Sequence, residues 1–333
     1  MHEGCPMSNT ALALWHESSQ ATNIRIVQKP EGQWLEVHAL HSLISMGTER
    51  LVCMGRVPAA LEHAMEVPYQ EGSLNLPVKY GYSLVGRIHQ PGDPNHQRLV
   101  HLLHPHQTKA WVNPDDIFLI PDGVSARRAT LASNMETAVN AIWDAGVSVG
   151  DTVLVVGYGL IGALLAELIN KIPGTTVYVA EKQPTRCKKA KDMGLQLWET
   201  DTNIQAQNIC DIAFHTSAQQ EGLETAMNSV GQEGVVIELS WYGDRPIQVH
   251  LGGMFHAQRK AIRASQVSSI AHQKQLRWDF RRRKALVFDL LKDERFDRLL
   301  TDSISFEALP GFFSELRAGP PPGMGWTVTY PSA

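Results

Sequence analysis

Three glycines at G-x-G-x-x-G spacing follow a short apolar run in the middle of the chain. The run is Val153–Val156, and the glycines are Gly157, Gly159 and Gly162. Four consecutive apolar residues are typical of a strand buried on both faces, and the apolar run that follows favours a helix. The first glycine permits a tight turn, the second lets the backbone approach a pyrophosphate, and the third lets helix pack against strand. We therefore predict a dinucleotide-binding turn made of Gly157, Tyr158, Gly159, Leu160, Ile161 and Gly162.

An acidic residue ends the next predicted strand, 176–180. Glu181 stands about 20 residues beyond the glycines, where a carboxylate accepts hydrogen bonds from the adenosine ribose and repels a 2′-phosphate. This favours NAD. Lys182 and Arg186 lie close by in the sequence, and a cation beside the ribose suits a phosphorylated cofactor. NAD is the predicted cofactor, with NADP as the alternative.

Polar side chains also follow the later strands of the same region. Two predicted strands, 212–214 and 235–239, each end just before a pair of such residues. Ligands of open α/β folds bind at the carboxyl edge of the parallel sheet. A further polar pair stands where this region begins. We expect the nicotinamide end of the cofactor to meet Thr216, Ser217, Ser240, Trp241, Thr137 and Asn140.

Length and composition set the class of protein. The chain has 333 residues, of which 43% are hydrophobic and 19% charged, enough for two globular domains. The net charge of −4, without a basic stripe or an acidic tail, predicts no nucleic-acid or membrane partner and leaves a small-molecule substrate. Four scattered cysteines without a C-x-x-C pair indicate a reducing cytoplasm. We expect neither an export signal nor a membrane span.

The pattern of apolar residues changes once along the chain and changes back. Residues 1–125 contain short strand-like runs separated by Gly, Pro and His, whereas strand and helix alternate from residue 126. Such alternation predicts a parallel sheet covered by helices. Two short runs, 304–306 and 326–330, could return to the first domain as strands. We therefore predict an α/β fold with one domain at 1–125 and 266–333 and a nucleotide-binding domain at 126–265.

This arrangement resembles the medium-chain dehydrogenase/reductase family. The likeness is carried by Met46-Gly-Thr-Glu49, by Gly81-Tyr-Ser-Leu-Val-Gly86 and by Leu131-Ala-Ser-Asn-Met-Glu-Thr-Ala138. Runs at 77–82, 103–107 and 134–141 look most like the branch that includes bacteriochlorophyllide a dehydrogenase. The resemblance implies a GroES-like β-rich catalytic domain, a Rossmann domain, a substrate cleft between them, and a homodimer that pairs the last strands of two nucleotide-binding domains.

The residues that hold zinc in zinc-dependent members of the family are replaced here. The resemblance puts Met46, Tyr82 and Ser133 in place of the Cys, His and Cys or acidic ligands, and zinc needs about three N, S or carboxylate donors. No cysteine lies between Cys53 and Cys187, so the structural zinc lobe is also absent. We predict no metal. The alternative is an atypical site built from His101, His104 and His106 with Glu49 or Glu136.

Without a metal, side chains must polarise and protonate the substrate oxygen. Thr48 is the first candidate, because its family position relays the proton between substrate and solvent. Tyr82 is the second, and Lys79, three residues earlier, could lower its pKa by charge. Glu49 and Glu136 could orient the donor or bind a substrate amine or hydroxyl. Each residue also has an ordinary role open to it, as a turn cap, a pocket lining or a solvated surface group.

Together these features predict a zinc-independent NAD(P)-dependent oxidoreductase that interconverts an alcohol and a carbonyl, or reduces an activated double bond. Two alternatives remain, a metal-dependent alcohol dehydrogenase with an atypical zinc site and a nucleotide-binding sensor without turnover. The basic run Arg281–Lys284 opens a predicted helix, 281–291. Cations at a helix start fit either a bound substrate anion or a solvated basic face.

Overall fold

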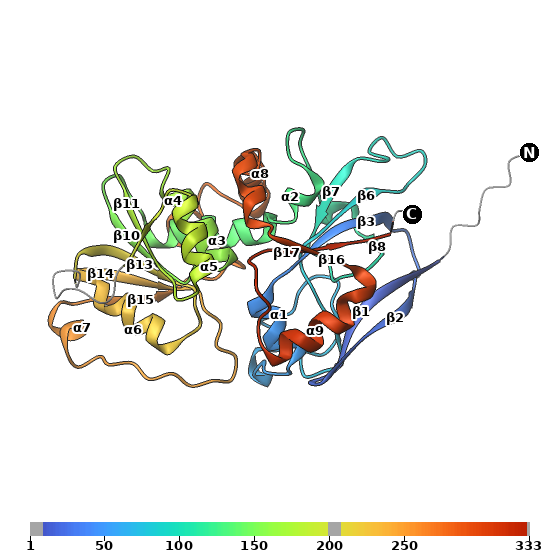
Figure 1. Ribbon diagram of the computed structural model, residues 1–333. Coiled ribbons are helices and arrows are strands. Elements are labelled where there is room, and N and C mark those ends of the chain that lie inside the picture. The colour runs from blue at the N-terminus through green and yellow to red at the C-terminus, as the bar shows by residue number, and fades with distance from the viewer. Residues whose placement is uncertain (1–8, 199–207, 332–333) are drawn as a thin grey trace, which may run out of the picture. The chain divides into compact units, whose positions relative to one another are not determined.

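The computed structural model describes residues 9–198 and 208–331 (Figure 1). Its contacts divide the chain into two compact units. One consists of the residues up to Ser133 together with those from Phe288 onward, and the other is Asn134–Val287. The domain boundaries expected from the sequence, after residues 125 and 265, both lie earlier in the chain than the boundaries of these units, after residues 133 and 287. Within the second unit, Arg283 binds Glu136, which ties residues beyond 265 to the nucleotide-binding region.

The first unit is built on two sheets. The larger has the strand order β16-β17-β3-β6-β7-β9, with β8 paired to β3, and the smaller has the order β2-β1-β5-β4. The strands are β1 (Thr10–Ser18), β2 (Ala21–Gln28), β3 (Leu35–Ile44), β4 (Glu71–Gly72), β5 (Val78–Lys79), β6 (Leu84–Ile88), β7 (Leu99–Leu102), β8 (Lys109–Val112), β9 (Ile117–Leu119), β16 (Asp302–Ser305) and β17 (Trp326–Thr329), and the helices are α1 (Met46–Cys53), α2 (Ala126–Ala129) and α9 (Leu309–Ala318).

The C-terminal segment completes the larger sheet, as the sequence suggested. Strand β17 pairs antiparallel with β3 and parallel with β16. Inward-facing residues of these strands join one buried apolar cluster with α9, in which Val37, Val328 and Phe313 are fully buried. Because this packing joins the two ends of the sequence, the first unit depends on both.

The second unit is a six-stranded sheet in the order β12-β11-β10-β13-β14-β15, and every pair in it is parallel. The predicted α/β alternation is confirmed. The strands are β10 (Thr152–Val156), β11 (Thr176–Ala180), β12 (Gln196–Leu197), β13 (Cys210–His215), β14 (Val230–Glu238) and β15 (Ala261–Ala264), and the helices are α3 (Ala132–Ala145), which begins in the first unit, α4 (Leu160–Ile169), α5 (Pro184–Asp192), α6 (Gln220–Ser229), α7 (Met254–Ala257) and α8 (Phe280–Leu290), which ends in it.

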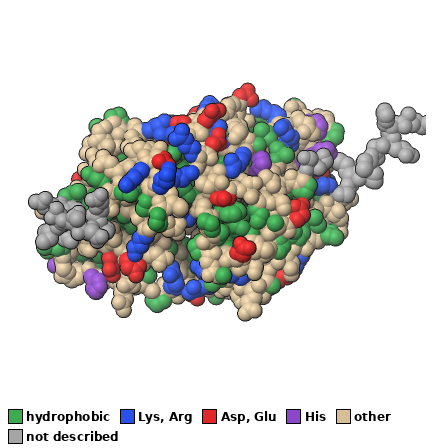
Figure 2. All heavy atoms as spheres, viewed as in Figure 1, with side chains coloured by type: hydrophobic (Ala, Val, Ile, Leu, Met, Phe, Trp, Pro, Cys, Tyr) green, Lys and Arg blue, Asp and Glu red, His purple; other side chains and the backbone are tan. Residues whose placement is uncertain are grey.

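The face drawn in Figure 2 carries basic, acidic and apolar side chains side by side. Among the helices of the two described ranges, none has the length and the apolar character that crossing a bilayer requires.

Candidate functional site

The glycine turn joins β10 to α4 and has the close packing that its spacing predicts. Gly157 has a φ of +93°, a conformation that favours glycine. A Cβ on Gly162 would lie 1.9 Å from the carbonyl oxygen of Gly157, so only glycine lets the helix approach the turn. A Cβ on Gly159 would find its nearest neighbour, Arg186 Nη1, 4.0 Å away. The backbone at Gly159 is therefore open to a ligand, while the other two glycines close the turn.

The start of α4 suits a phosphate. Gly159 is its N-cap residue and supplies no side-chain cap. The first N–H groups of a helix have no partner within the helix and attract an anion. Leu160 and Ile161 form the first turn and are half-buried. The Tyr158 side chain is fully buried, and burial raises the pKa of its hydroxyl well above the ordinary value. The Tyr158 side chain is therefore out of reach of a ligand.

Glu181 is fixed beside this turn at the end of β11. Its Oε2 accepts a hydrogen bond from the backbone N–H of Tyr158 at 2.9 Å. Its Oε1 accepts from the N–H groups of Lys182 and Gln183 at 2.7 and 2.9 Å. Arg186 Nη1 lies 4.0 Å from Glu181 Oε2. A carboxylate and a guanidinium thus both stand next to the glycine turn, whereas Lys182 is exposed.

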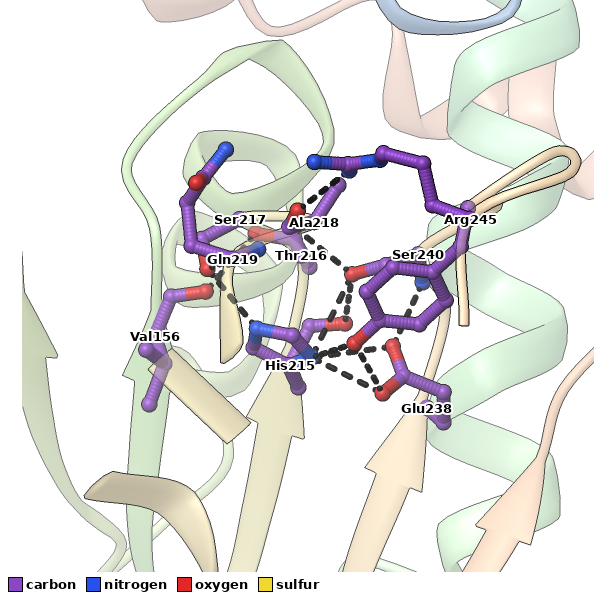
Figure 3. Close-up of polar contacts among 10 residues, drawn as sticks. Val156, His215, Thr216, Ser217, Ala218, Gln219, Glu238, Ser240 and Arg245 are labelled. Atoms are coloured by element: carbon purple, nitrogen blue, oxygen red, sulfur yellow. Dashed lines mark hydrogen bonds and ion pairs between the residues drawn. The ribbon is translucent and has the colours of Figure 1, made fainter. Parts of the chain in front are cut away.

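The carboxyl ends of β13 and β14 carry a dense polar cluster (Figure 3). Thr216 donates to the carbonyl oxygens of Val156 and Gly157, at 3.1 and 2.9 Å, and so ties β13 to the glycine turn. Ser217 Oγ lies 2.7 Å from His215 Nε2, and the Ser240 hydroxyl accepts from the N–H of Ala218 at 3.0 Å. Trp241 and Thr137 are half-buried.

Sequence reasoning missed His215 and Glu238 in this cluster. His215 is the last residue of β13 and Glu238 the last of β14, and they pair at 2.8 Å. The predicted strands were 212–214 and 235–239, so the pattern put one residue just past a strand end and the other inside a strand. In the parallel pairing of β13 with β14, His215 lies directly beside Glu238. That pairing is the signal that could have identified them.

In the first unit, hydroxyl groups gather around Tyr82. The side chains of Ser45 and Thr48, at the start of α1, lie near its hydroxyl. Burial raises the pKa of Tyr82 to about 12, and these two side chains offset only part of the rise. At neutral pH Tyr82 is therefore a protonated hydroxyl that can donate. The structure brings Thr48 and Tyr82 together.

The expectation that Lys79 lowers the pKa of Tyr82 is wrong. The pKa of Tyr82 is raised, and Lys79 binds Glu71 and, at 3.1 Å, Gln107 Oε1. The reason is register, because β5 pairs with β4 so that Lys79 stands directly opposite Glu71. Burial lowers the pKa of the Lys79 ammonium below its ordinary value.

Glu49 is fully buried in a network of its own. One oxygen accepts from the N–H of Ser45 at 2.7 Å, and the other accepts from His106 Nε2 at 2.9 Å. The second ring nitrogen of His106 lies 2.7 Å from the hydroxyl of Ser42, which also bonds Tyr330 at 2.8 Å. Both carboxylate oxygens thus have protein partners, and Glu49 fixes the start of α1.

Glu136 is likewise buried among partners. Lys284 Nζ lies 2.6 Å from one carboxylate oxygen and Arg283 Nε 3.3 Å from the other. Arg283 also donates to Asn140 Oδ1 at 3.0 Å, so the network joins α3 to α8. Both explanations offered for the basic run 281–284 are therefore wrong for Arg283 and Lys284, which are interior partners of an acid. Arg281 and Arg282 are exposed.

The residues present do not fit a zinc ion. Among the described residues, no group of three His, Cys, Asp or Glu side chains is placed to hold a metal. His101 Nε2 lies 3.1 Å from Ser83, His104 Nδ1 donates to its neighbour's carbonyl, and His106 is bound to Glu49, so the atypical site from three histidines is not formed. At the family's ligand positions, Ser133 donates to the Tyr82 carbonyl at 2.9 Å, and the Tyr82 phenol keeps its proton.

No family model matches the sequence. Two curated relatives are sorbitol dehydrogenase of Bacillus subtilis (strain 168), 25% identical over 146 residues, and D-guloside 3-dehydrogenase of Escherichia coli (strain K12), 24% identical over 189 residues. The matches cover 40% of this chain and 41% of the first relative, and 54% of this chain and 54% of the second. The chain thus spans about half the length of the curated relatives it matches.

Solved structures match over almost the whole chain. The rspB short chain alcohol dehydrogenase of E. coli CFT073, complexed with NADH, has a TM-score of 0.75 at 15% identity and covers 97% of this chain and 100% of its own. TarJ of S. aureus in complex with NADPH has a TM-score of 0.72 at 14% identity, with the same coverage. Identities this low show a shared fold.

Proposed function

We propose that this chain, which has the fold of the medium-chain dehydrogenase/reductase family, is a zinc-independent NAD(P)-dependent oxidoreductase acting on an alcohol or carbonyl. The observation that carries the proposal is the glycine turn with Glu181 and Arg186 fixed beside it. When bound, the nicotinamide supplies the carbon that takes or gives a hydride. The curated relatives are named as dehydrogenases of sorbitol and of D-gulosides, which favours a polyol or sugar hydroxyl as substrate.

The glycine turn binds the cofactor pyrophosphate in this proposal. Backbone N–H groups at Gly159 and in the first turn of α4 donate to phosphate oxygens, because no side chain caps that helix. Glu181 accepts from the adenosine ribose, which favours NAD, while Arg186 can meet a 2′-phosphate and so admits NADP. The hydroxyls of Thr216, Ser217 and Ser240, with Thr137 and Trp241, stand as the expected contacts of the nicotinamide end.

Thr48 and Tyr82 transfer the proton to and from the substrate oxygen in this proposal. In the reduction direction Tyr82, protonated at neutral pH, donates to the substrate oxygen, and Thr48 and Ser45 return the proton along their hydroxyls. In the oxidation direction the same chain takes the proton away. Glu49 and Glu136 are then structural anchors, because each is buried and has its oxygens bonded within the protein, whereas Glu181 is only half-buried.

The experiment that tests this function is turnover with purified protein. NAD⁺ or NADP⁺ is supplied with a panel of polyols and sugar glycosides, and reduced nicotinamide is followed by absorbance, before and after dialysis against a chelator. We expect turnover that the chelator leaves unchanged. Stoichiometric zinc in the purified protein, with activity lost on its removal, would overturn the zinc-independent part. Cofactor binding without turnover on any substrate would instead favour a sensor.

A homodimer and a cytoplasmic location complete the proposal. Strand β15 is an edge strand of the six-stranded sheet, and three of its four residues are exposed. An edge of unpaired backbone groups invites pairing with another strand, here β15 of a second copy. The described cysteines, Cys53, Cys187 and Cys210, are free thiols, as a reducing compartment requires. Sedimentation at micromolar concentration tests the dimer.

A further inference from the structure

A serine, a histidine and a glutamate lie in line at the carboxyl ends of β13 and β14 (Figure 3). Ser217 Oγ is 2.7 Å from His215 Nε2. On the other side of the ring, His215 Nδ1 is 2.8 and 3.0 Å from the two carboxylate oxygens of Glu238. This is the order and spacing of groups in hydrolases that use a Ser-His-acid triad, which recurs on unrelated folds. The proton path proposed above, through Thr48 and Tyr82, makes no use of this array.

The hydrogen bonds fix which ring nitrogen carries the proton. A carboxylate only accepts, so Nδ1–H donates to Glu238, and Nε2 is left to accept the hydroxyl of Ser217. Glu238 is held by two further donors, the Tyr242 hydroxyl at 3.0 Å and the Ser240 N–H at 2.7 Å. His215 itself is fully buried, whereas Ser217 is half-buried. The imidazole is thus oriented as a general base for the serine.

The backbone around the serine also fits a nucleophile. Ala218 has a φ of +52°, an uncommon conformation for a residue other than glycine, and follows the serine directly. Helix α6 begins close behind, and its N-terminus favours negative charge. Gly222 in its first turn leaves room for the pair, because a Cβ there would lie 2.2 Å from Ser217 Oγ and 2.8 Å from His215 Nε2.

We propose that Ser217, His215 and Glu238 form a serine nucleophile site that hydrolyses small carboxylic esters, an activity separate from hydride transfer. Ser217 Oγ bonds to the ester carbonyl carbon while its proton passes to His215 Nε2. The bond from that carbon to the alcohol oxygen then breaks, and the alcohol leaves with the proton from Nε2. Water attacks the acyl-serine, again giving a proton to Nε2. The acid leaves, and the proton returns to Ser217.

One contact occupies the donor that this chemistry needs. The N–H of Ala218, the residue after the nucleophile, is the donor expected to stabilise the oxyanion, and it is now bonded to the Ser240 hydroxyl at 3.0 Å. An ester oxygen must displace that hydroxyl. Ser240→Ala would free the donor, so we expect it to acylate about 3- to 10-fold faster than the unchanged protein.

Covalent labelling tests the proposal. Full-length protein without added cofactor, since Ser217 also belongs to the proposed cofactor edge, is treated with a fluorophosphonate probe, and the adduct is mapped by peptide mass. Hydrolysis of p-nitrophenyl acetate is followed in parallel. We expect an adduct on Ser217 and a loss of about 100-fold or more in both readouts for Ser217→Ala and for His215→Gln. Ser148→Ala, at an exposed serine, is the matched control. Its Ser217 should be labelled to the same extent as in the unchanged protein.

Glu238 is a positioning residue, and its test is the pH profile of labelling. The groups that face His215 are Glu238, Tyr242, Ser240 and Ser217, with Arg245 stacked on the Tyr242 ring at 5.9 Å. Glu238→Gln removes the charge that stabilises the protonated ring, so the pH midpoint of labelling should fall and the rate should drop about 10-fold or more. Melting temperatures are measured for every variant. An unlabelled Ser217 in the folded protein, or equal ester hydrolysis by folded Ser217→Ala, would overturn the proposal.

Discussion

The glycine turn of the second unit and the polar cluster around Tyr82 in the first unit were both predicted from short motifs, with different outcomes. The turn depends on backbone shape, so Gly157 and Gly162 alone account for its geometry. The Tyr82 cluster depends on side-chain charge, and the charged residues near it have partners that the short motifs do not contain. Lys79 is bound to Glu71 and Glu49 to His106, separated by 8 and 57 residues. Local sequence thus predicts backbone geometry well and charge partners poorly.

The largest expected effect concerns Glu136, which the sequence made a catalytic candidate and the structure surrounds with buried cations. Glu136→Gln leaves Lys284, 2% exposed, without its carboxylate. Removing one partner of a buried ion pair typically costs about 3–5 kcal/mol, so we expect the free energy of unfolding in urea to fall by that amount. Turnover per folded molecule should change little.

A double variant serves as the control for this prediction. Lys284→Met in the Glu136→Gln background removes the buried ammonium that has lost its carboxylate, so part of the lost stability should return. If Glu136→Gln stayed as stable as the unchanged protein and lost turnover instead, Glu136 would rejoin the catalytic residues.

Acid should destabilise the first unit through its buried histidines. Burial lowers the pKa of His16 to about 3, and His104 behaves alike. Between about pH 6.5 and 3 the unfolded chain binds a proton at each site that the folded chain does not, so stability falls as pH falls through that window. The loss per histidine is of order a few kcal/mol. Urea unfolding of the full chain at several pH values measures it.

His16→Gln provides the comparison. A glutamine can still meet the hydroxyl of Thr22, which now lies 2.9 Å from His16 Nδ1, but it does not titrate. The pH slope of the free energy of unfolding should therefore become shallower, whatever the variant's stability at pH 8. An unchanged slope would show that His16 takes up its proton at the same pH in the folded and the unfolded chain.

Gly159→Asp tests the glycine turn itself. The nearest atom to a Cβ at this position is 4.0 Å away, so the fold should tolerate the side chain. A carboxylate at the start of α4 would repel the pyrophosphate, and we expect NADH and NADPH affinity, measured by fluorescence titration, to fall more than about 100-fold. Gly252→Asp, at a glycine with no atom within 4 Å, adds the same charge elsewhere and should bind normally. Equal affinities would mean that the turn does not bind phosphate.

The fold was largely predictable, and the reason is local periodicity. Alternating apolar strands and helices from residue 126 onward specify a parallel sheet, and the glycine spacing locates its first turn. The pairing of His215 with Glu238 was not predictable in this way, because it needs the register of β13 against β14, which no local pattern contains. The same holds for Arg283. Its basic neighbours in the sequence favour a surface position, but the side chain is buried against Glu136.

Tyr82→Phe is the finest test of the comparison, because it removes one oxygen and leaves the ring. If the hydroxyl donates the proton, kcat should fall about 10- to 100-fold while the dissociation constant of NADH stays within about twofold. Tyr80→Phe is the matched control, a buried tyrosine whose ring centroid lies 6.1 Å from that of Tyr82. It should leave kcat nearly unchanged. A similar loss in both variants would point to packing, and equal losses of turnover and NADH affinity would remove Tyr82 from the proton path and leave Thr48 as the remaining donor.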